Sequence, residues 1–178
     1  THLEFLPATH GSMVESVWLF EGALQEREQF YPTGTLDLLI QLGGSSPSFR
    51  VVDGQSTETP AAALTGMLLA PLTIETPAET SILLGARLRP AAAAALFELP
   101  QHLVTGSAVS LDDLIGAESL RLVERLCDAP SHVQRLRIMA SWISARMAAG
   151  VGTEPIVGRA VAEIERARGA VGVADLLA

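Results

Sequence analysis

The sequence predicts an α+β protein in which an N-terminal antiparallel β-barrel or sandwich, cupin-like in form, is followed by an α-helical segment. In residues 1–89, glycine or proline interrupts short apolar runs at intervals of about ten residues, as in all-β sandwiches and barrels. After Pro90 the apolar residues recur at helical spacing instead. A chain of 178 residues is long enough to bury a core. We therefore expect a β-rich unit over residues 1–89 and helices over 90–169.

The expected strands are the apolar runs of the first half, each closed by a turn-forming residue such as Gly22, Pro32 or Pro71. They cover residues 14–20, 28–31, 35–42, 48–52, 64–69 and 81–88. The glycine-rich stretch over 43–47 is expected to be a hairpin turn, because no helix follows it whose N-terminus could bind a phosphate group.

Capping signals place the helices of the second half. Ser110 is an expected N-cap followed by two acidic residues, and Ser131 opens a capping box with Gln134. Gly169 is expected just beyond the C-terminal end of a further helix. Helices are expected over 91–97, from 110 onward, over 118–127, from 131 to 149, and from 153–155 to 168. Residues 170–178 are expected to begin one more helix.

Composition and charge exclude several classes of protein. The net charge is −8, and all twelve basic residues are arginines. Since phosphate backbones are bound by clustered basic residues, we expect this chain not to bind DNA by itself. No apolar run reaches the length of a membrane span. The single cysteine, Cys127, excludes an internal disulfide and fits a reducing compartment, so we expect a cytoplasmic protein.

Motifs for catalysis, metals and cofactors are not found. A cupin-type metal site needs histidines on the strands, whereas the four histidines lie outside the expected strands. The sequence contains no phosphate-binding loop, dinucleotide fingerprint or nucleophile elbow, so we expect no cofactor, no metal and no enzyme activity. Cys127 is interpreted as a buried structural thiol and not as a nucleophile.

Five residues in the β half are unusual for a plain core. Asp37 is a carboxylate inside an apolar run, Arg87 and Arg89 are two residues apart on one strand, and Trp18 and Tyr31 are amphipathic rings. One interpretation is that the rings pack in the core and the charges pair at its rim. In the other, these residues line a pocket, where the rings supply apolar area and the charges orient a ligand.

One helical stripe is a candidate dimer interface. Its apolar residues follow 3-4-3-4 spacing and are Val133, Leu136, Ala140, Ile143 and Met147. The same stripe could instead pack on the chain's own sheet or on the preceding helix.

The order of several segments is similar to the N-terminal half of a subgroup of AraC-type bacterial transcription regulators. The matching pieces are Trp18 with Gly22, residues 31–40, 85–91 with the following Leu99-Pro100, 109–114 and 172–177. Gly-Ala-Arg-Leu-Arg-Pro-Ala at 85–91 is close to the Gly-Val-Arg-Phe-Arg-Pro-Gly of that subgroup. Two residues depart from the pattern: Thr33 stands where aspartate is usual, and Ala91 where glycine is usual.

The resemblance implies a domain that senses a small-molecule effector and helices that form a homodimer. Residues 170–178 would then begin a helix-turn-helix DNA-binding domain that lies outside this chain. Two alternatives remain open. Asp37, Arg87 and Arg89 could serve a small metal-independent barrel enzyme, isomerase-like, acting on a sugar or aromatic acid. The chain could also be a structural dimer module without a ligand.

Overall fold

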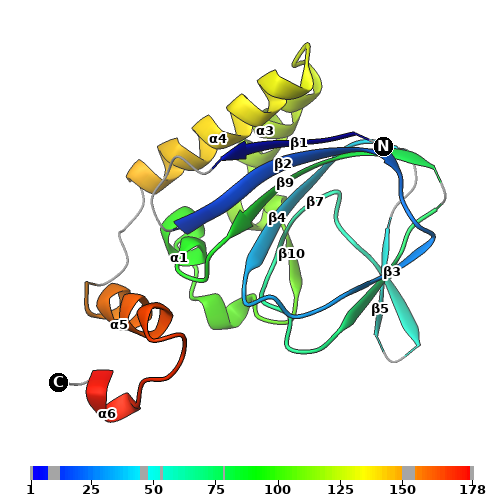
Figure 1. Cartoon of the computed structure of the whole chain (residues 1–178). Coiled ribbons are helices and arrows are strands. Elements are labelled where there is room, and N and C mark those ends of the chain that lie inside the picture. Colours follow the sequence, from blue (N-terminus) through cyan, green and yellow to red (C-terminus); the bar gives the residue numbers. More distant parts are fainter. Residues whose placement is uncertain are drawn as a thin grey trace.

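A computed structural model describes residues 2–7, 13–44, 48–52, 54–77, 79–149 and 155–176. In these residues two antiparallel sheets form a sandwich-like N-terminal part, and helices follow (Figure 1). The predicted α+β class is therefore confirmed.

The larger sheet has six strands in the order β1-β2-β9-β4-β7-β10. Their bounds are β1 His2–Pro7, β2 Val14–Ala23, β9 Thr80–Leu88, β4 Leu36–Gly43, β7 Ala62–Thr65 and β10 Ala108–Ser110. The smaller sheet has four strands in the order β3-β8-β5-β6. Their bounds are β3 Arg27–Phe30, β8 Leu72–Glu75, β5 Phe49–Val52 and β6 Gln55–Glu58.

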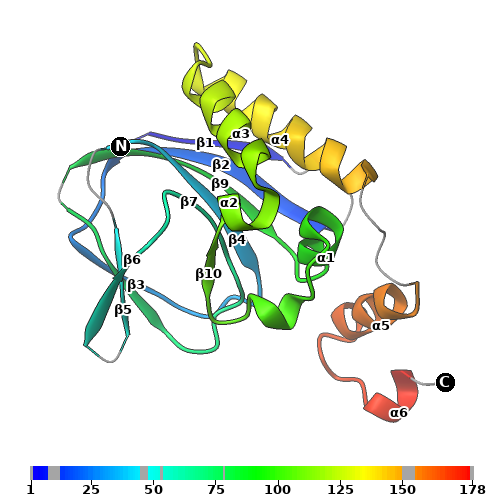
Figure 2. The same cartoon turned by 180° about the vertical axis from the view of Figure 1, so that it is seen from behind.

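All the helices come after β9 in the chain, and between η2 and α2 the chain returns once to the sheet to form β10. They are α1 Ala92–Phe97, the 3-10 helix η2 Gln101–Leu103, α2 Leu111–Ile115, α3 Ala117–Cys127, α4 His132–Ala149, α5 Pro155–Arg166 and α6 Val173–Leu176. Figures 1 and 2 show α3 and α4 on one side of the six-stranded sheet and the smaller sheet on the other.

The N-caps behave as the sequence predicts. The Ser110 hydroxyl accepts a hydrogen bond from the Asp112 backbone N–H at 3.2 Å, and Ser131 accepts one from Gln134 at 3.3 Å. The end of α5 differs by one position: the helix ends at Arg166, and Arg168, with a φ of +51°, takes the left-handed position predicted for Gly169, which follows it with a φ of +78°.

The core lies between the six-stranded sheet and the helices. Alternate residues of β4 and β9 point toward the helices, and those in the middle of the sheet are fully buried there. The sheet contributes Leu36, Leu38, Ile40, Leu84, Ala86 and Leu88, and the helices contribute Leu122, Leu126, Leu136, Met139 and Ile143. Burying a leucine or isoleucine side chain stabilises the fold by about 1.5–3 kcal/mol, so this layer holds sheet and helices together.

Several elements differ from the sequence prediction. The strand expected over 64–69 lies at Ala62–Thr65 instead; beyond it the Val104 carbonyl lies so close to Gly66 that a Cβ there would collide with it, and the Gly66 N–H donates to the Ser107 carbonyl. Strands β1, β6, β8 and β10 were not predicted, since β6 is polar throughout and β10 has only three residues. Part of the hairpin turn at 43–47 and the helix start at 153–154 lie outside the described residues.

Candidate ligand-binding face

The face of the six-stranded sheet that points away from the helices carries the unusual residues of the β half. Strand pairing places Ser16 opposite Arg87, and Arg87 opposite Asp37. One row further along, Trp18, Gly85 and Leu39 are paired in the same way. We call this surface the inner face; its residues are Ser16, Trp18, Phe20, Asp37, Leu39, Gln41, Thr65, Leu83, Gly85 and Arg87.

The inner face is only partly covered. Of these ten residues, Gly85 is buried and the other nine are half-buried; Ala63 and Ser81, which lie on the same side of the sheet, are buried at 4% and 1%. On the opposite side, the central residues of β4 and β9 are fully buried against the helices, while Leu42 and Ile82 are only partly buried. The sheet therefore has one side that serves as core and one side that solvent reaches.

Arg87 and Asp37 form the charged centre of the inner face. The Arg87 Nε–H donates to Asp37 Oδ1 at 3.2 Å, and the two side chains are 43% and 26% exposed. Among the described residues, the guanidinium makes no other hydrogen bond. Arginine has five N–H donors, so the four on Nη1 and Nη2 remain available to an acceptor that approaches this face.

Trp18 lies next to this pair because Gly85 leaves room for its ring. A Cβ at Gly85 would lie 2.9 Å from Nε1 of Trp18 and closer still to two of its ring carbons. The indole therefore lies across the backbone of β9. Within the described part of the chain, its N–H has no hydrogen-bond partner, so it is a second available donor.

Tyr31 and Arg89 do not join this group. Tyr31 follows β3 of the smaller sheet, is 63% exposed, and donates its hydroxyl to Gln29 Oε1 at 2.9 Å. Arg89 lies just beyond β9, with its Nε 3.8 Å from Glu15 Oε1. Three of the five predicted residues, Trp18, Asp37 and Arg87, are thus neighbours on one face.

Sequence reasoning missed the apolar part of the inner face. Phe20, Leu39 and Leu83 are half-buried there, and they looked like ordinary strand residues in the sequence. Alternation within each strand was available as a signal, but the strands could be aligned with one another only once the register was known.

The predicted stripe on α4 packs mainly inside its own chain. Leu136 and Ile143 are 2% and 0% exposed and belong to the core, and Ala140 and Met147 are partly buried against it. Val133, by contrast, is 45% exposed. Of the two interpretations left open, packing on the chain's own sheet accounts for Leu136 and Ile143.

Cys127 corrects a prediction. The thiol was expected to be buried, but it is exposed and free. It ends α3, and the buried positions of this helix are taken by Ser119, Leu122 and Leu126 instead.

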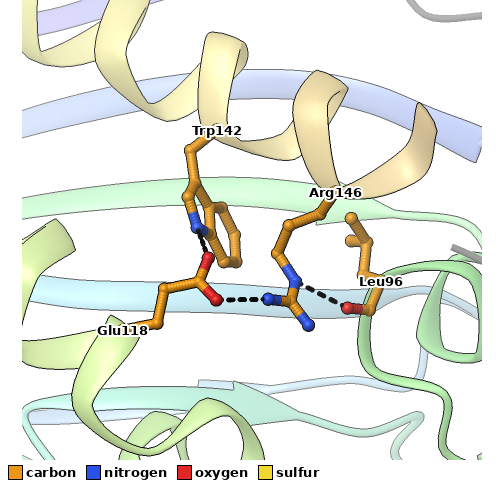
Figure 3. Close-up of polar contacts among 4 residues, drawn as sticks. All are labelled: Leu96, Glu118, Trp142 and Arg146. Atoms are coloured by element: carbon orange, nitrogen blue, oxygen red, sulfur yellow. Dashed lines mark hydrogen bonds and ion pairs between the residues drawn. The ribbon is translucent and has the colours of Figure 1, made fainter. Parts of the chain in front are cut away.

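A polar network between the helices was not predicted either (Figure 3). The Glu118 carboxylate accepts a hydrogen bond from Trp142 Nε1 at 2.8 Å and one from Arg146 Nη1 at 2.6 Å. Arg146 also donates from Nε to the Leu96 carbonyl at 2.8 Å, and its guanidinium lies 5.6 Å from the centroid of the Trp142 ring. This network ties α1, α3 and α4 together.

Two opposing effects set the pKa of Glu118. Burial alone would raise it, but the hydrogen bonds from Trp142 and Arg146 and the arginine charge outweigh burial and lower the pKa. The carboxylate is therefore the form that the network stabilises.

Two surface hollows, of about 350 Å³ at the start of α4 and about 490 Å³ on the smaller sheet, are lined by residues outside the inner face. The described residues contain no group of His, Cys, Asp or Glu side chains that could hold a metal ion. None of their helices combines the length and apolar character needed to cross a membrane.

Fold and face together define a two-sheet β domain with attached helices and one half-buried, partly aromatic face. Comparison with protein-family models shows that residues 4–110 match the family described as Domain of unknown function (DUF6597). The match covers more than half of the chain, so the protein belongs to this family. It extends from within β1 to the end of β10 and includes the whole inner face. A search of the curated proteins finds no match to the chain.

Proposed function

We propose that this chain is the effector-sensing and homodimerisation part of a cytoplasmic bacterial transcription regulator of the AraC type. A small molecule binds to the inner face and changes which arrangement of the dimer is favoured. Contact with DNA belongs to a C-terminal domain that residues 170–178 would begin. The similarity of segments 31–40 and 85–91 to such regulators supports this reading.

The observation that carries the proposal is the contrast between the two faces of one sheet. The centre of the helix-covered face is fully buried, while the inner face keeps Trp18, Phe20 and the Arg87–Asp37 pair half-buried. Apolar surface beside a few convergent polar groups is the usual composition of a small-molecule site.

The fold offers a connection from this face to the helices. Arg87 points to the inner face, while its neighbours Ala86 and Leu88 on β9 pack against the helices. The chain then enters α1, and the carbonyl of Leu96 in α1 is held by Arg146 of α4. A ligand that moves β9 therefore acts on elements joined to α4.

Dimerisation is the second half of the proposal. Of the stripe on α4, Val133 is the residue with a large exposed fraction, so it is our candidate for the contact. Light scattering of the purified chain over a range of concentrations tests this. We expect a dimer, and we expect Val133→Glu to shift it toward monomer. A monomer at every concentration would contradict this part of the proposal.

Ligand binding is tested by thermal shift with a library of small organic acids, sugars and aromatic compounds. We expect saturable stabilisation by at least one compound, because a ligand that binds only the folded state raises its stability. Arg87→Gln should abolish the shift, while Arg27→Gln, which removes an arginine from the smaller sheet, should retain it. Equal shifts in both variants would contradict a site on the inner face. Chemical turnover of the bound compound would favour the isomerase alternative.

A further inference from the structure

We infer that the ligand of the inner face is an organic monocarboxylate with a flat apolar body, such as an aryl carboxylate. This inference rests on the proposed function and adds the chemical class of the effector.

The head group follows from the polar row of the face. Ser16, Arg87, Asp37 and Thr65 lie side by side across four strands. Asp37 takes up only the Nε–H of Arg87 and so holds the guanidinium in one orientation, with its Nη donors unused among the described residues. A planar fork of N–H donors matches the two oxygens of a carboxylate.

The charge balance disfavours a doubly charged ligand. Arg87 and Asp37 compensate each other, so a monoanion leaves one net negative charge at the site. A phosphate dianion would leave two, beside the Asp37 carboxylate and on a chain whose net charge is already −8. Partly buried charges without a counterion are costly, so a monoanion fits better than a dianion.

The body of the ligand follows from the neighbouring rows. Two residues further along each strand, about 7 Å away, the face presents Trp18 and Leu39. The next row presents Phe20 and Leu83, with Gln41 at its edge. A sugar would need a polar partner for most of its hydroxyl groups, which these rows do not supply. An apolar body is matched by all four side chains.

Gly85 favours a flat body in particular. Because it has no side chain, the indole of Trp18 rests across β9 and is held against the sheet. A ring held in this way offers an aromatic surface for offset stacking. Its N–H is free, among the described residues, to donate to the ligand as well.

Isothermal titration calorimetry with matched probes tests the inference. The probes are benzoate, phenylacetate and 3-phenylpropionate, the neutral amide of each, phenyl phosphate and glucose. We expect at least one acid to bind saturably, and its amide to bind about 10- to 100-fold more weakly, as for the loss of a charged hydrogen bond.

Variants locate the contact. Arg87→Gln should reduce the affinity for the acid to that of its amide, and Arg87→Lys, which keeps the charge but lacks the fork, should give an intermediate value. Trp18→Phe should weaken acid and amide alike. Arg27→Gln is the matched control, since it removes the same charge from the other sheet and should leave the affinity unchanged. Unfolding curves of each variant show that it is folded.

The opposite results distinguish an error in the carboxylate class from an error in the proposed function. An amide, glucose or phenyl phosphate that binds as tightly as the acids overturns the carboxylate class, and so does Arg87→Gln with full affinity for the acid. If none of the acids binds, the carboxylate class is overturned as well. If another compound binds, and Trp18→Ala and Arg87→Gln abolish its binding, the proposed function is supported and only the assignment of a carboxylate ligand is wrong. If no compound in the library binds, the effector-sensing function falls as well.

Discussion

The indole of Trp18 on β2 occupies the space above Gly85 on β9 that any larger residue would fill. We predict that Gly85→Ala lowers the free energy of unfolding by about 1–3 kcal/mol, because the added methyl group forces the ring out of its position. Urea denaturation followed by circular dichroism measures this.

A double variant separates the clash from a general effect of alanine on the strand. Combining Gly85→Ala with Trp18→Leu should cost less than the sum of the two single changes, since the smaller side chain leaves room for the methyl group. Strict additivity would show that the ring does not rest on Gly85.

The Arg87–Asp37 pair should contribute little to stability. Because the side chains are 43% and 26% exposed, a double-mutant cycle with Arg87→Gln and Asp37→Asn should give a coupling of about 0.5–1 kcal/mol in unfolding free energy. A much larger coupling would mean that the pair is needed to hold the fold, and loss of ligand binding in Arg87→Gln could then no longer be assigned to lost contacts.

Glu118 should make stability depend on pH. Its pKa in the folded protein lies below the ordinary value of 4.5, so its contribution is present above that value and is lost as the pH falls through the folded pKa. We expect Glu118→Gln to lower the unfolding free energy at pH 7 by about 1 kcal/mol, given that the side chain is 39% exposed. Denaturant unfolding from pH 7 to pH 3 should show wild type and variant converging.

Glu124→Gln is the control for this experiment. Glu124 lies on the same helix and is exposed, so the variant should differ little from wild type at either end of the pH range. A Glu118→Gln difference that stays constant down to pH 3 would contradict the role assigned to the carboxylate.

Two residues of the α4 stripe should respond differently to truncation. Ile143 is fully buried, so Ile143→Ala should cost about 2–5 kcal/mol of unfolding free energy. Val133 is 45% exposed, and Val133→Ala should change the stability of the monomer by less than about 0.5 kcal/mol. The comparison is made below the concentration at which any dimer forms. Similar losses of stability at the two positions would mean that α4 does not turn the Ile143 side toward the core and the Val133 side toward solvent.

Much of the fold could be predicted from short-range patterns. The main strands near 14–20, 35–42 and 81–88, the N-caps at Ser110 and Ser131, and the stop near Gly169 all depend on residues close together in the chain. The prediction of a strand over 64–69 was wrong beyond Thr65, where the next residue, Gly66, contacts Val104 and Ser107, which lie far away in the sequence. The prediction that Cys127 is buried was wrong for a similar reason, since the way α3 packs on the sheet decides which of its sides is covered.

The candidate site could be predicted only as a set of unusual residues. Trp18, Asp37 and Arg87 were recognised by their chemistry, but Tyr31 and Arg89 were recognised in the same way and lie elsewhere. Nothing in the local pattern separated the two groups, and the apolar residues Phe20, Leu39 and Leu83 gave no signal at all.

The sequence by itself determined the class of fold, the turns and the helix caps, because these follow from the conformational preferences of neighbouring residues. Only the tertiary structure decided that Arg87 meets Asp37, that Trp18 rests on Gly85, and that Ile143 faces the core. The reason is physical. Because β2 and β4 both pair with β9, which lies far from them in the chain, a shift of one residue in either pairing would turn Trp18, Asp37 or Arg87 to the opposite face. The side of α4 that carries Ile143 is set in the same long-range way, by how the helix packs on the sheet.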